Sequence, residues 1–375
     1  MLAIGLMSGT SLDGVDASLV EIKGVLKKKF ILKDFVFIPY SDTFKNKILK
    51  NSKLESSNVL DICSLNVELS YKYNEAISAL LNKAHLRAKD ISFIAMHGQT
   101  VWHNPVASIG QAPSTLQLGD PSVISEEFHV KVISNFRTAD IAAGGSGAPL
   151  VPFANYVLFS SDTKNIAMQN IGGIGNVTYL KKNGTIDDIV AFDTGPGNML
   201  IDGAMRKLYN KEYDESGNTA YSGKVNEELI SLLLKDPYLD MPLPKSTGRE
   251  KYNVKYLDYC IDYVLSHGGT NADVISTLTA YTADSISYSY KRFIGSVDTV
   301  YVSGGGAYNK FLLERLKKNL GCEIKVMENA DSLEALSFAL LGYYTLKHRP
   351  SNVPSVTGAK RPVVLGSITD PLIKG

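Results

Sequence analysis

The stretch that decides the fold is Ile4-Gly5-Leu6-Met7-Ser8-Gly9-Thr10-Ser11-Leu12-Asp13-Gly14-Val15-Asp16-Ala17-Ser18-Leu19-Val20. An apolar run ends at a small, hydroxyl-rich turn, and a second apolar run begins at Val15. This pattern predicts a strand, a tight turn and a second strand. Gly9 and Gly14 permit a close approach of backbone to a ligand, and the hydroxyls and amides of the turn suit phosphate oxygens. A hairpin whose turn is merely polar is the plainer interpretation of this stretch alone.

Composition limits the classes of protein to which the chain can belong. Its 375 residues are long for a single core and suit two domains. A hydrophobic content of 44% and a charged content of 21% are typical of globular proteins. The net charge of +1 gives no electrostatic footprint for nucleic acid or an anionic membrane, and the three cysteines lack the spacing of a disulfide or metal site. We therefore expect a cytoplasmic globular protein that binds neither nucleic acid nor membrane.

In the first half of the chain, strand and helix patterns alternate. The compact apolar run Ile91–Met96 predicts a buried strand with His97 and Gln99 just beyond its C-terminal end, and ligands gather at such ends in α/β sheets. Asp120 and Pro121 are the residue types that start a helix. The other expected elements are strands over 30–39 and 130–134 and helices over 45–50 and 60–84.

The second half repeats the opening pattern. A strand over 165–170, a glycine turn over 172–176 and a strand over 177–180 echo the first hairpin, which indicates internal duplication. We place the domain boundary in the glycine-dense segment 143–149, giving domains 1–145 and 146–345 and a tail, 346–375, that folds back. The remaining expected elements are strands over 188–192, 299–303 and 324–326 and helices over 199–209, 225–235, 254–265, 272–293, 310–320 and 332–347.

Four glycine-rich turns stand at predicted strand ends: Ser8–Gly14, Gly172–Asn176, Asp193–Asn198 and Gly304–Asn309. A single turn of this kind is weak evidence, but four spread over both halves are hard to explain by turn formation alone. Neither G-x-x-x-x-G-K-[ST] nor G-x-G-x-x-G occurs in the chain. A nucleotide site built from these turns would therefore belong to another architecture.

The two strand–turn–strand units and the segment Val300–Asn309 resemble the phosphate and adenosine motifs of the actin/hexokinase/Hsp70 superfamily. More narrowly, the chain resembles the anhydro-N-acetylmuramic acid kinases. Met7 replaces an aspartate expected in the first phosphate turn of the wider superfamily, a feature that the narrower family shares. The matching pieces run from end to end and cover 5–16, 97–103, 136–152, 170–176, 192–198, 302–309, 334–339 and 352–359.

The resemblance implies an α/β protein with two actin-like (ribonuclease H-like) domains around an interdomain ATP cleft. It implies a kinase that uses ATP and Mg²⁺, opens 1,6-anhydro-N-acetylmuramic acid with water and phosphorylates the sixth-carbon hydroxyl. The product would be N-acetylmuramate 6-phosphate, in peptidoglycan recycling. The only partner implied is the small anhydro-sugar, and the oligomeric state stays open, with a homodimer as one option.

The resemblance also implies roles for individual residues. Asp193 would be the base that activates water. Magnesium would lie near Asp13 or Asp16, through water, with no direct metal ligand assigned. The sugar would be bound by His97, Gln99, Arg137, Asp140 and Glu334. The nucleotide would be bound by Gly9, Thr10, Ser11, Leu12, Asp13, Gly14, Val15, Asp16, Asn170, Gly172, Gly173, Gly195, Gly304, Gly305, Gly306 and Asn309.

Each role has a plainer competitor. Asp193 would cap the helix that begins near Gly197, Arg137 would pair with Asp140 instead of the lactyl carboxylate, His97 would be a core histidine, and Glu334 would serve the helix dipole. Two other functions also compete. One is a kinase for a neutral anhydro-sugar such as levoglucosan, and the other is a non-catalytic ATP-binding protein that acts as a chaperone or filament subunit.

Overall fold

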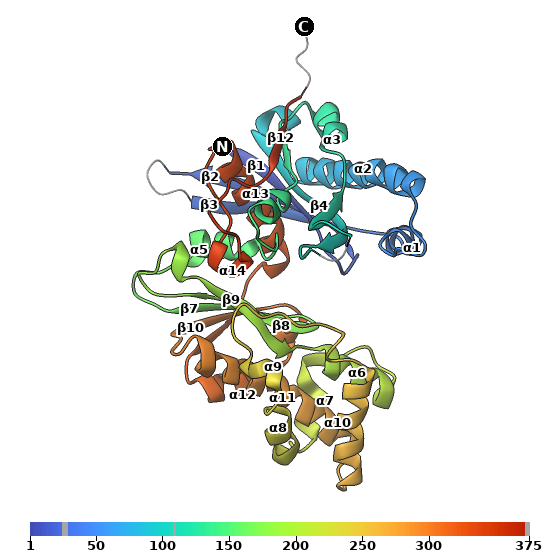
Figure 1. Ribbon diagram of the computed structural model, residues 1–375, viewed down its shortest axis with the longest axis vertical. Coiled ribbons are helices and arrows are strands. Elements are labelled where there is room, and N and C mark those ends of the chain that lie inside the picture. The colour runs from blue at the N-terminus through green and yellow to red at the C-terminus, as the bar shows by residue number, and fades with distance from the viewer. Residues whose placement is uncertain (25–28, 108–109, 372–375) are drawn as a thin grey trace. The chain divides into compact units, whose positions relative to one another are not determined.

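The computed structural model describes residues 1–24, 29–107 and 110–371, which fold into two units (Figure 1). The first unit contains Met1–Leu158 and the described residues from Asp331 onward, and the second contains Phe159–Ala330. These limits differ from the boundaries that we expected at 145 and 345. Two helices explain the difference, because α5 (Val151–Phe159) and α13 (Ala330–Leu346) contact one another through the rings of Phe153 and Tyr344, 4.8 Å apart.

The first unit is built on a sheet that begins with the expected hairpin. Strands β1 (Leu2–Ser8) and β2 (Gly14–Lys23) pair antiparallel, with Met7 opposite Asp16. Strand β3 (Lys29–Pro39) adds to β2, and β4 (Phe93–Asn104) lies parallel to β1. In the described residues this sheet has the order β12-β6-β4-β1-β2-β3, with β5 paired to β4. The remaining strands are β5 (Ser114–Leu118), β6 (Val132–Ser134) and β12 (Ser367–Thr369).

Strand alternation gives this sheet two different faces. Ile4 and Leu6 belong to one core cluster with residues of α2 (Val59–Lys83). Gly5, which lies between them, is on the opposite face of the sheet, against the backbone of α13 at Ala335. The remaining helices of this unit are α1 (Asp42–Asn51), η1 (Ala88–Asp90), α3 (Pro121–Phe128), α4 (Thr138–Ala142) and α14 (Pro354–Thr357).

The second unit repeats the strand order of the first. Strands β7 (Ile166–Ile171), β8 (Ile174–Leu180) and β9 (Val190–Pro196) pair antiparallel in sequence. Strand β10 (Thr299–Ser303) then lies parallel to β7, and β11 (Glu323–Val326) parallel to β10. In both sheets the first three strands form an antiparallel meander whose first strand is flanked by a parallel one. This shared order confirms the expected α/β architecture of two ribonuclease H-like domains and is consistent with the internal duplication that the sequence pattern indicates.

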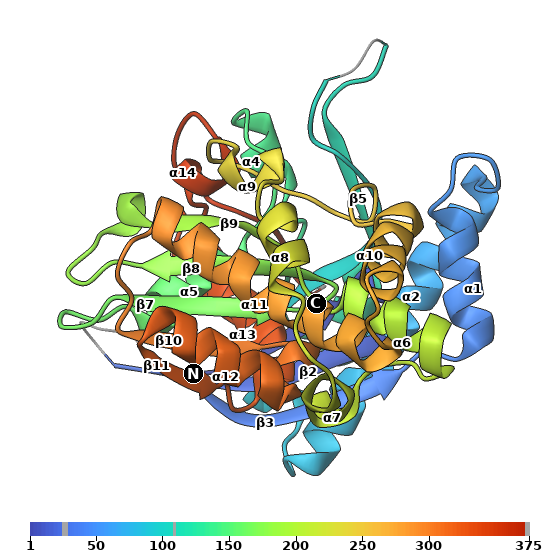
Figure 2. The ribbon, with the colours of Figure 1, turned by 90° about the horizontal axis from the view of Figure 1, so that it is seen from below.

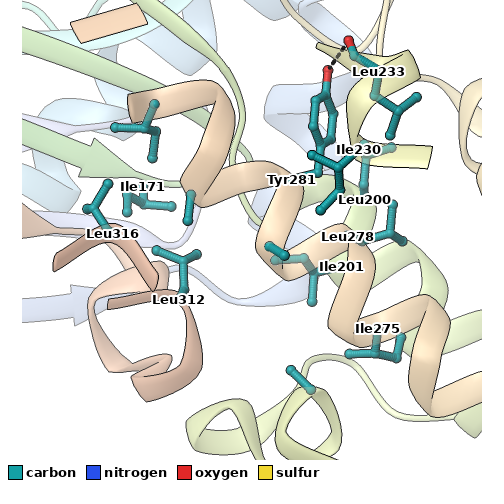
Figure 3. Packing of buried hydrophobic residues seen from close by; sticks show 14 of the residues in the cluster. Ile171, Leu200, Ile201, Ile230, Leu233, Ile275, Leu278, Tyr281, Leu312 and Leu316 are labelled. Carbon is teal, nitrogen blue, oxygen red and sulfur yellow. Dashed lines mark hydrogen bonds between the residues drawn. The ribbon is translucent and has the colours of Figure 1, made fainter. Parts of the chain in front are cut away.

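The core of the second unit forms around α11 (Asn271–Phe293). Figure 3 shows Ile275, Leu278 and Tyr281 of this helix packed among Leu200 and Ile201, and the Tyr281 hydroxyl bonds the Leu233 carbonyl oxygen at 3.5 Å. The other helices are α6 (Met199–Tyr209), α7 (Asn218–Ser222), α8 (Glu227–Leu233), α9 (Pro237–Asp240), α10 (Val254–Ser266) and α12 (Lys310–Leu320), with short 3₁₀ turns η2 (Ile186–Asp188), η3 (Glu215–Gly217) and η4 (Gly305–Tyr308).

Two predicted strands are longer than expected. Strand β4 continues to Asn104 because its second half pairs with β5, and Figure 2 shows this pair as a hairpin that projects from the first sheet. Strand β9 continues to Pro196 because Gly195 pairs with Gly175 of β8. His97, Gln99 and Asp193 therefore lie within strands and not in the turns beyond them. In the part of the chain that the structure describes, no helix is both long and apolar enough to cross a membrane.

Candidate active site

The turn between β1 and β2 is a tight loop held by two hydrogen bonds to the Gly9 carbonyl oxygen. The Leu12 amide bonds the Gly9 carbonyl oxygen at 3.2 Å, and Leu12 has a φ of 61°. The Gln99 side-chain amide also donates to the Gly9 oxygen, at 3.1 Å. Of the residues predicted to bind nucleotide, Thr10, Ser11 and Asp13 are exposed, whereas Leu12 and Val15 are buried in the core. Leu12 and Val15 therefore position the turn, and the exposed residues are the ones that a phosphate can reach.

Most glycines in the chain are required by the conformation or the packing of the protein itself. They either have a left-handed φ or leave no room for a Cβ, as at Gly14, where a Cβ would lie 2.2 Å from the Ile38 carbonyl oxygen. Among the described glycines, only Gly9, Gly172 and Gly173 combine a φ outside the left-handed range with no protein atom closer than 3.4 Å to a Cβ. All three lie in predicted phosphate turns. Open space over a glycine backbone is what a closely approaching anion needs, so these turns fit nucleotide phosphates.

Strand alternation places Asp16 of β2 on the face that α13 covers. Two residues further along β2, the Ser18 hydroxyl bonds the Ser332 carbonyl oxygen at 3.0 Å, which fixes the first turn of α13 above this strand. Burial, and then the neighbouring charges of Glu334, Asp331 and Asp13, raise the pKa of Asp16 to about 7. Carboxylates that crowd together in this way favour a cation among them.

Hard oxygen donors beside a phosphate turn are the chemistry that Mg²⁺ prefers. Asp13 and Asp16 therefore fit the ion that the resemblance implies, with water completing its coordination. The described residues hold no group of three His, Cys, Asp or Glu side chains able to bind a metal directly. The magnesium position stays a prediction.

The raised pKa of Asp16 gives a prediction for the unliganded protein. An aspartate with a folded pKa of about 7 and an ordinary unfolded pKa of 3.8 binds more protons in the folded state between these values. The free energy of unfolding therefore falls as the pH rises from about 4 to about 7. We expect Asp16→Asn to be more stable than the wild type at pH 8 by roughly 1–2 kcal/mol, allowing for partial solvent screening. Urea unfolding at pH 4.5 and pH 8 measures this, and a difference that is equal at both pH values would contradict it.

Buried His97 and partly exposed Arg137 form a hydrogen-bonded pair on the α13 face. The Arg137 Nε donates to His97 Nε2 at 2.9 Å, and Arg137 Nη1 donates to the Gly147 carbonyl oxygen at 2.7 Å. Burial and the charge of Arg137 hold the pKa of His97 well below its usual range, so the ring is neutral and accepts at Nε2. Its ring lies against Phe338 of α13 at a tilt of 44°, with centroids 4.8 Å apart. His97 thus orients the guanidinium.

The guanidinium of Arg137 stays charged and is influenced by the charge of Glu334. Burial lowers its pKa to about 10, and the charge of Glu334 offsets part of this decrease. Glu334 keeps part of its surface exposed, but protein around its carboxyl raises its pKa, which the charge of Arg137 in turn lowers. An arginine fixed by two internal bonds has donors left for a ligand carboxylate, because the group carries five N–H bonds.

Asp140 has an internal role instead of the expected contact with the sugar. It is fully buried, and its oxygens accept from the Gly147 amide at 2.8 Å, Asn352 Nδ2 at 2.7 Å and Thr357 Oγ1 at 2.8 Å. Among the described residues no ion pair joins it to Arg137, so the plainer interpretation as an ion pair is also wrong. Asp140 ties the glycine segment, including the carbonyl that binds Arg137, to the C-terminal tail.

In the second unit, three hydrogen bonds join Asp193 to the segment 238–247. The Thr247 amide donates to Asp193 Oδ2 at 2.9 Å, the Asp193 amide donates to the Lys245 carbonyl oxygen at 3.3 Å, and the Tyr238 hydroxyl donates to the Asp193 carbonyl oxygen at 2.8 Å. Burial raises the pKa of Asp193 to about 6, against the Thr247 bond, which lowers it. Asp193 lies within β9 and caps no helix, so the plainer interpretation as a cap is wrong. With a pKa of about 6, its carboxylate is ionised near neutral pH, as a general base must be.

Three glycine turns of the second unit meet at the ends of β7, β9 and β10. The Asn198 amide bonds the Gly172 carbonyl oxygen at 2.7 Å, and the Gly197 amide bonds the Gly173 carbonyl oxygen at 2.9 Å. A Cβ on Gly304 would lie 2.6 Å from Asn170 Oδ1. The sequence prediction that these turns form one site is therefore consistent with their geometry in this unit.

Some of the predicted nucleotide residues have structural roles. Gly195 has a φ of 128°, and its Cβ would lie 3.1 Å from Ser285 Oγ, so it lets α11 approach β9. A Cβ on Gly306 would lie 2.4 Å from Ile171 Cγ2. The Asn309 side chain caps α12 by accepting from the Leu312 amide at 3.0 Å. Gly305 is less crowded, with Asn198 Nδ2 3.1 Å from its Cβ position.

Sequence reasoning missed the residues that surround Asp193. Tyr238, Lys245 and Thr247 lie in a segment of short turns with little regular pattern, and they are 45 to 54 positions away along the chain. The polar run Lys245-Ser246-Thr247-Gly248 is the one local signal, and it is weak without the partner strand.

Comparison with known proteins gives the family. A family model described as anhydro-N-acetylmuramic acid kinase matches residues 1–371. A relative from Clostridioides difficile (strain 630), named anhydro-N-acetylmuramic acid kinase, is 46% identical and covers 98% of both chains. A relative of the same name from Francisella tularensis subsp. novicida (strain U112) is 44% identical and covers 97% of both chains. The chain therefore belongs to the anhydro-N-acetylmuramic acid kinase family.

Proposed function

We propose that this kinase opens 1,6-anhydro-N-acetylmuramic acid with water and transfers the γ-phosphoryl group of ATP to the freed sixth-carbon oxygen. The product is N-acetylmuramate 6-phosphate. The observation that supports the proposal most strongly is the Asp193 carboxylate, which is fixed by the Thr247 amide at 2.9 Å and has a pKa raised to about 6. Membership in the family favours this function over a non-catalytic ATP-binding protein and over a kinase for a neutral sugar.

Asp193 takes a proton from water as the water oxygen bonds to the anomeric carbon. The bond between that carbon and the bridging oxygen breaks, and the bridging oxygen, now the sixth-carbon oxygen, keeps the electron pair. This oxygen forms the new bond to the γ-phosphorus while the bond from phosphorus to the β-phosphate oxygen breaks, which leaves ADP. The proton on Asp193 returns to solvent, so that water, sugar and ATP are consumed in equal amounts.

Sugar recognition is assigned to the first unit. Arg137, oriented by His97 and the Gly147 carbonyl oxygen, would bind the lactyl carboxylate. Glu334, at the start of α13, would accept from sugar hydroxyls. Gln99 bonds the Gly9 carbonyl oxygen and so links the sugar strand to the phosphate turn.

Phosphate binding is assigned to the turns at Gly9 and at Gly172–Gly173, which have room over their backbones. Thr10 and Ser11 are exposed hydroxyls in the first of them. Asp13 and Asp16 would hold Mg²⁺ through water, and this ion, when bound, supplies positive charge that offsets the negative charge of the phosphates. Three free cysteines fit a reducing compartment, so we place the reaction in the cytoplasm, in peptidoglycan recycling.

A coupled assay tests the proposed function directly. ADP release is measured with 1,6-anhydro-N-acetylmuramic acid and with levoglucosan, and the molecular mass of the sugar product is determined by mass spectrometry. We expect the acidic sugar to be used preferentially and its product to gain one water and one phosphoryl group. A product that keeps the anhydro bridge, or no ADP with either sugar, would contradict the proposal.

Arg137→Met is expected to remove the preference for the acidic sugar. Methionine fills most of the space but donates no hydrogen bond, so the lactyl carboxylate loses its charged partner. We expect the ratio of kcat/KM for the acidic sugar to kcat/KM for levoglucosan to fall about 10- to 100-fold. Arg315→Met is a matched control, because Arg315 is a partly buried arginine bound to Asp284 at 2.6 Å and to Glu227 at 3.0 Å, and its loss should leave the ratio unchanged. Equal losses for both sugars in Arg137→Met would argue against this role.

A further inference from the structure

A lysine lies buried beside the proposed base without any assigned role. Lys245 is 6% exposed, and its Nζ lies 4.4 Å from the ring centroid of Phe293, 4.7 Å from that of Tyr238 and 5.5 Å from that of Phe192. The same Nζ donates to the carbonyl oxygens of Leu239 at 2.8 Å and Tyr238 at 3.2 Å. Aromatic faces and carbonyl oxygens both stabilise an ammonium, so the charge is held by rings and backbone.

These contacts join the two ends of the segment 238–247. The Lys245 side chain reaches back to the carbonyls at the beginning of the segment, and its own carbonyl oxygen accepts from the Asp193 amide. Two residues later the Thr247 amide meets the Asp193 carboxylate, and Tyr238, at the other end, bonds the Asp193 carbonyl oxygen. All three bonds to Asp193 therefore come from a segment that this ammonium fastens.

We propose that Lys245 is a positioning residue for Asp193: its ammonium fixes the segment that orients the carboxylate. The positive charge of Lys245 also favours the ionised form of that carboxylate. The proposal rests on the proposed role of Asp193 as the base. It adds a residue whose contacts lie within the protein and which sets the geometry and the charge state of the residue that activates water.

Other charges also face the two groups. Asp240, Asp193 and Asp236 favour the charged form of Lys245, Arg292 opposes it, and burial, the largest effect, lowers its pKa to about 8. The ammonium is therefore mostly charged at pH 7. At Asp193, Glu250 opposes ionisation, whereas Lys245 and the Thr247 amide favour it. Removal of the lysine charge leaves burial and Glu250 to raise the pKa of Asp193 further.

The test is the pH profile of kcat/KM for the acidic sugar, measured on the full chain. In Lys245→Met we expect the acid limb to move upward by about half a pH unit or more, and kcat to fall while KM changes less. Lys245→Arg keeps the charge, so its acid limb should stay where it is in the wild type. Lys251→Met is the matched control, because Lys251 lies 6.0 Å from the same Tyr238 ring but pairs with Asp236 at 2.8 Å; its acid limb should not move.

A folded Lys245→Met protein with an unmoved acid limb would overturn the proposal. If thermal unfolding shows that Lys245→Met does not fold, Lys245→Gln replaces it, with the same expected upward shift. If neither neutral variant folds, Lys245→Arg decides, since an acid limb that moves upward although the charge is kept would overturn the proposal. Asp193→Asn distinguishes failure of the proposed function from failure of the inference about Lys245. Normal turnover in Asp193→Asn would show that Asp193 is not the base. If Asp193→Asn loses turnover but the acid limb of Lys245→Met does not move, only the role of Lys245 is contradicted.

Discussion

Asp193→Asn is expected to lower kcat about 10²- to 10⁴-fold, the usual contribution of a general base. The amide has the shape of the carboxylate and its oxygen can still accept from the Thr247 amide, which donates at 2.9 Å in the wild type. It cannot take a proton from water, so the anhydro bridge opens far more slowly. Because phosphoryl transfer needs the freed bridging oxygen, it slows to the same extent.

The measurement is steady-state ADP release with saturating anhydro-sugar, together with calorimetric titration of ATP. We expect ATP affinity to stay within about twofold of the wild type, since the phosphate turns are unchanged. Asp188→Asn is a matched control, because Asp188 accepts from the Thr185 amide at 2.8 Å just before the same strand. Its turnover should remain normal. Near-normal turnover in Asp193→Asn would show that another group activates the water.

Gly5→Val is expected to cost more than about 4 kcal/mol of unfolding free energy, or to prevent folding. A Cβ at this position would lie 1.8 Å from the Ala335 carbonyl oxygen and 2.9 Å from the Ala339 amide nitrogen. Neither atom can move without displacing α13 from β1. Glu334 lies in the same turn of that helix, so any protein that does fold should also bind the sugar poorly.

Thermal and urea unfolding measure this effect, and Gly9→Ala serves as the control in the same hairpin. A Cβ on Gly9 would meet no protein atom closer than 3.7 Å, so this variant should unfold like the wild type and show its defect only in ATP binding. A Gly5→Val protein of normal stability would mean that α13 does not rest on the strand as described.

The fold followed from the sequence wherever local signals are strong. The ends of α6, β10 and α12 agree with the prediction because apolar periodicity and capping residues such as Asn309 define them within a few positions. Strand β5 and helix α5 were not predicted, since a five-residue strand and a nine-residue apolar helix have no distinctive period. Their structure depends on partners that lie far away along the chain.

The sequence predicts the main residues of the candidate site but not the residues that orient them. Asp193 and Arg137 could be chosen from the motifs, yet the bonds that orient them come from Thr247, Gly147 and His97, at distances of 2.9, 2.7 and 2.9 Å. Asp140 shows the limit most clearly, because a buried carboxylate with three neutral donors and one in a sugar site look the same in sequence. Gly5 lies in a phosphate motif, but its lack of a side chain serves helix packing.

The order of the units along the chain has a consequence for synthesis. Residues 159–330 are inserted within the first unit, which resumes only at Asp331. The second unit is therefore complete on the ribosome while the first sheet still lacks α13 and β12, which cover one face and pair with β6. During that interval the face of β1 around Gly5 is uncovered, and the first unit acquires Glu334 only in the last part of translation.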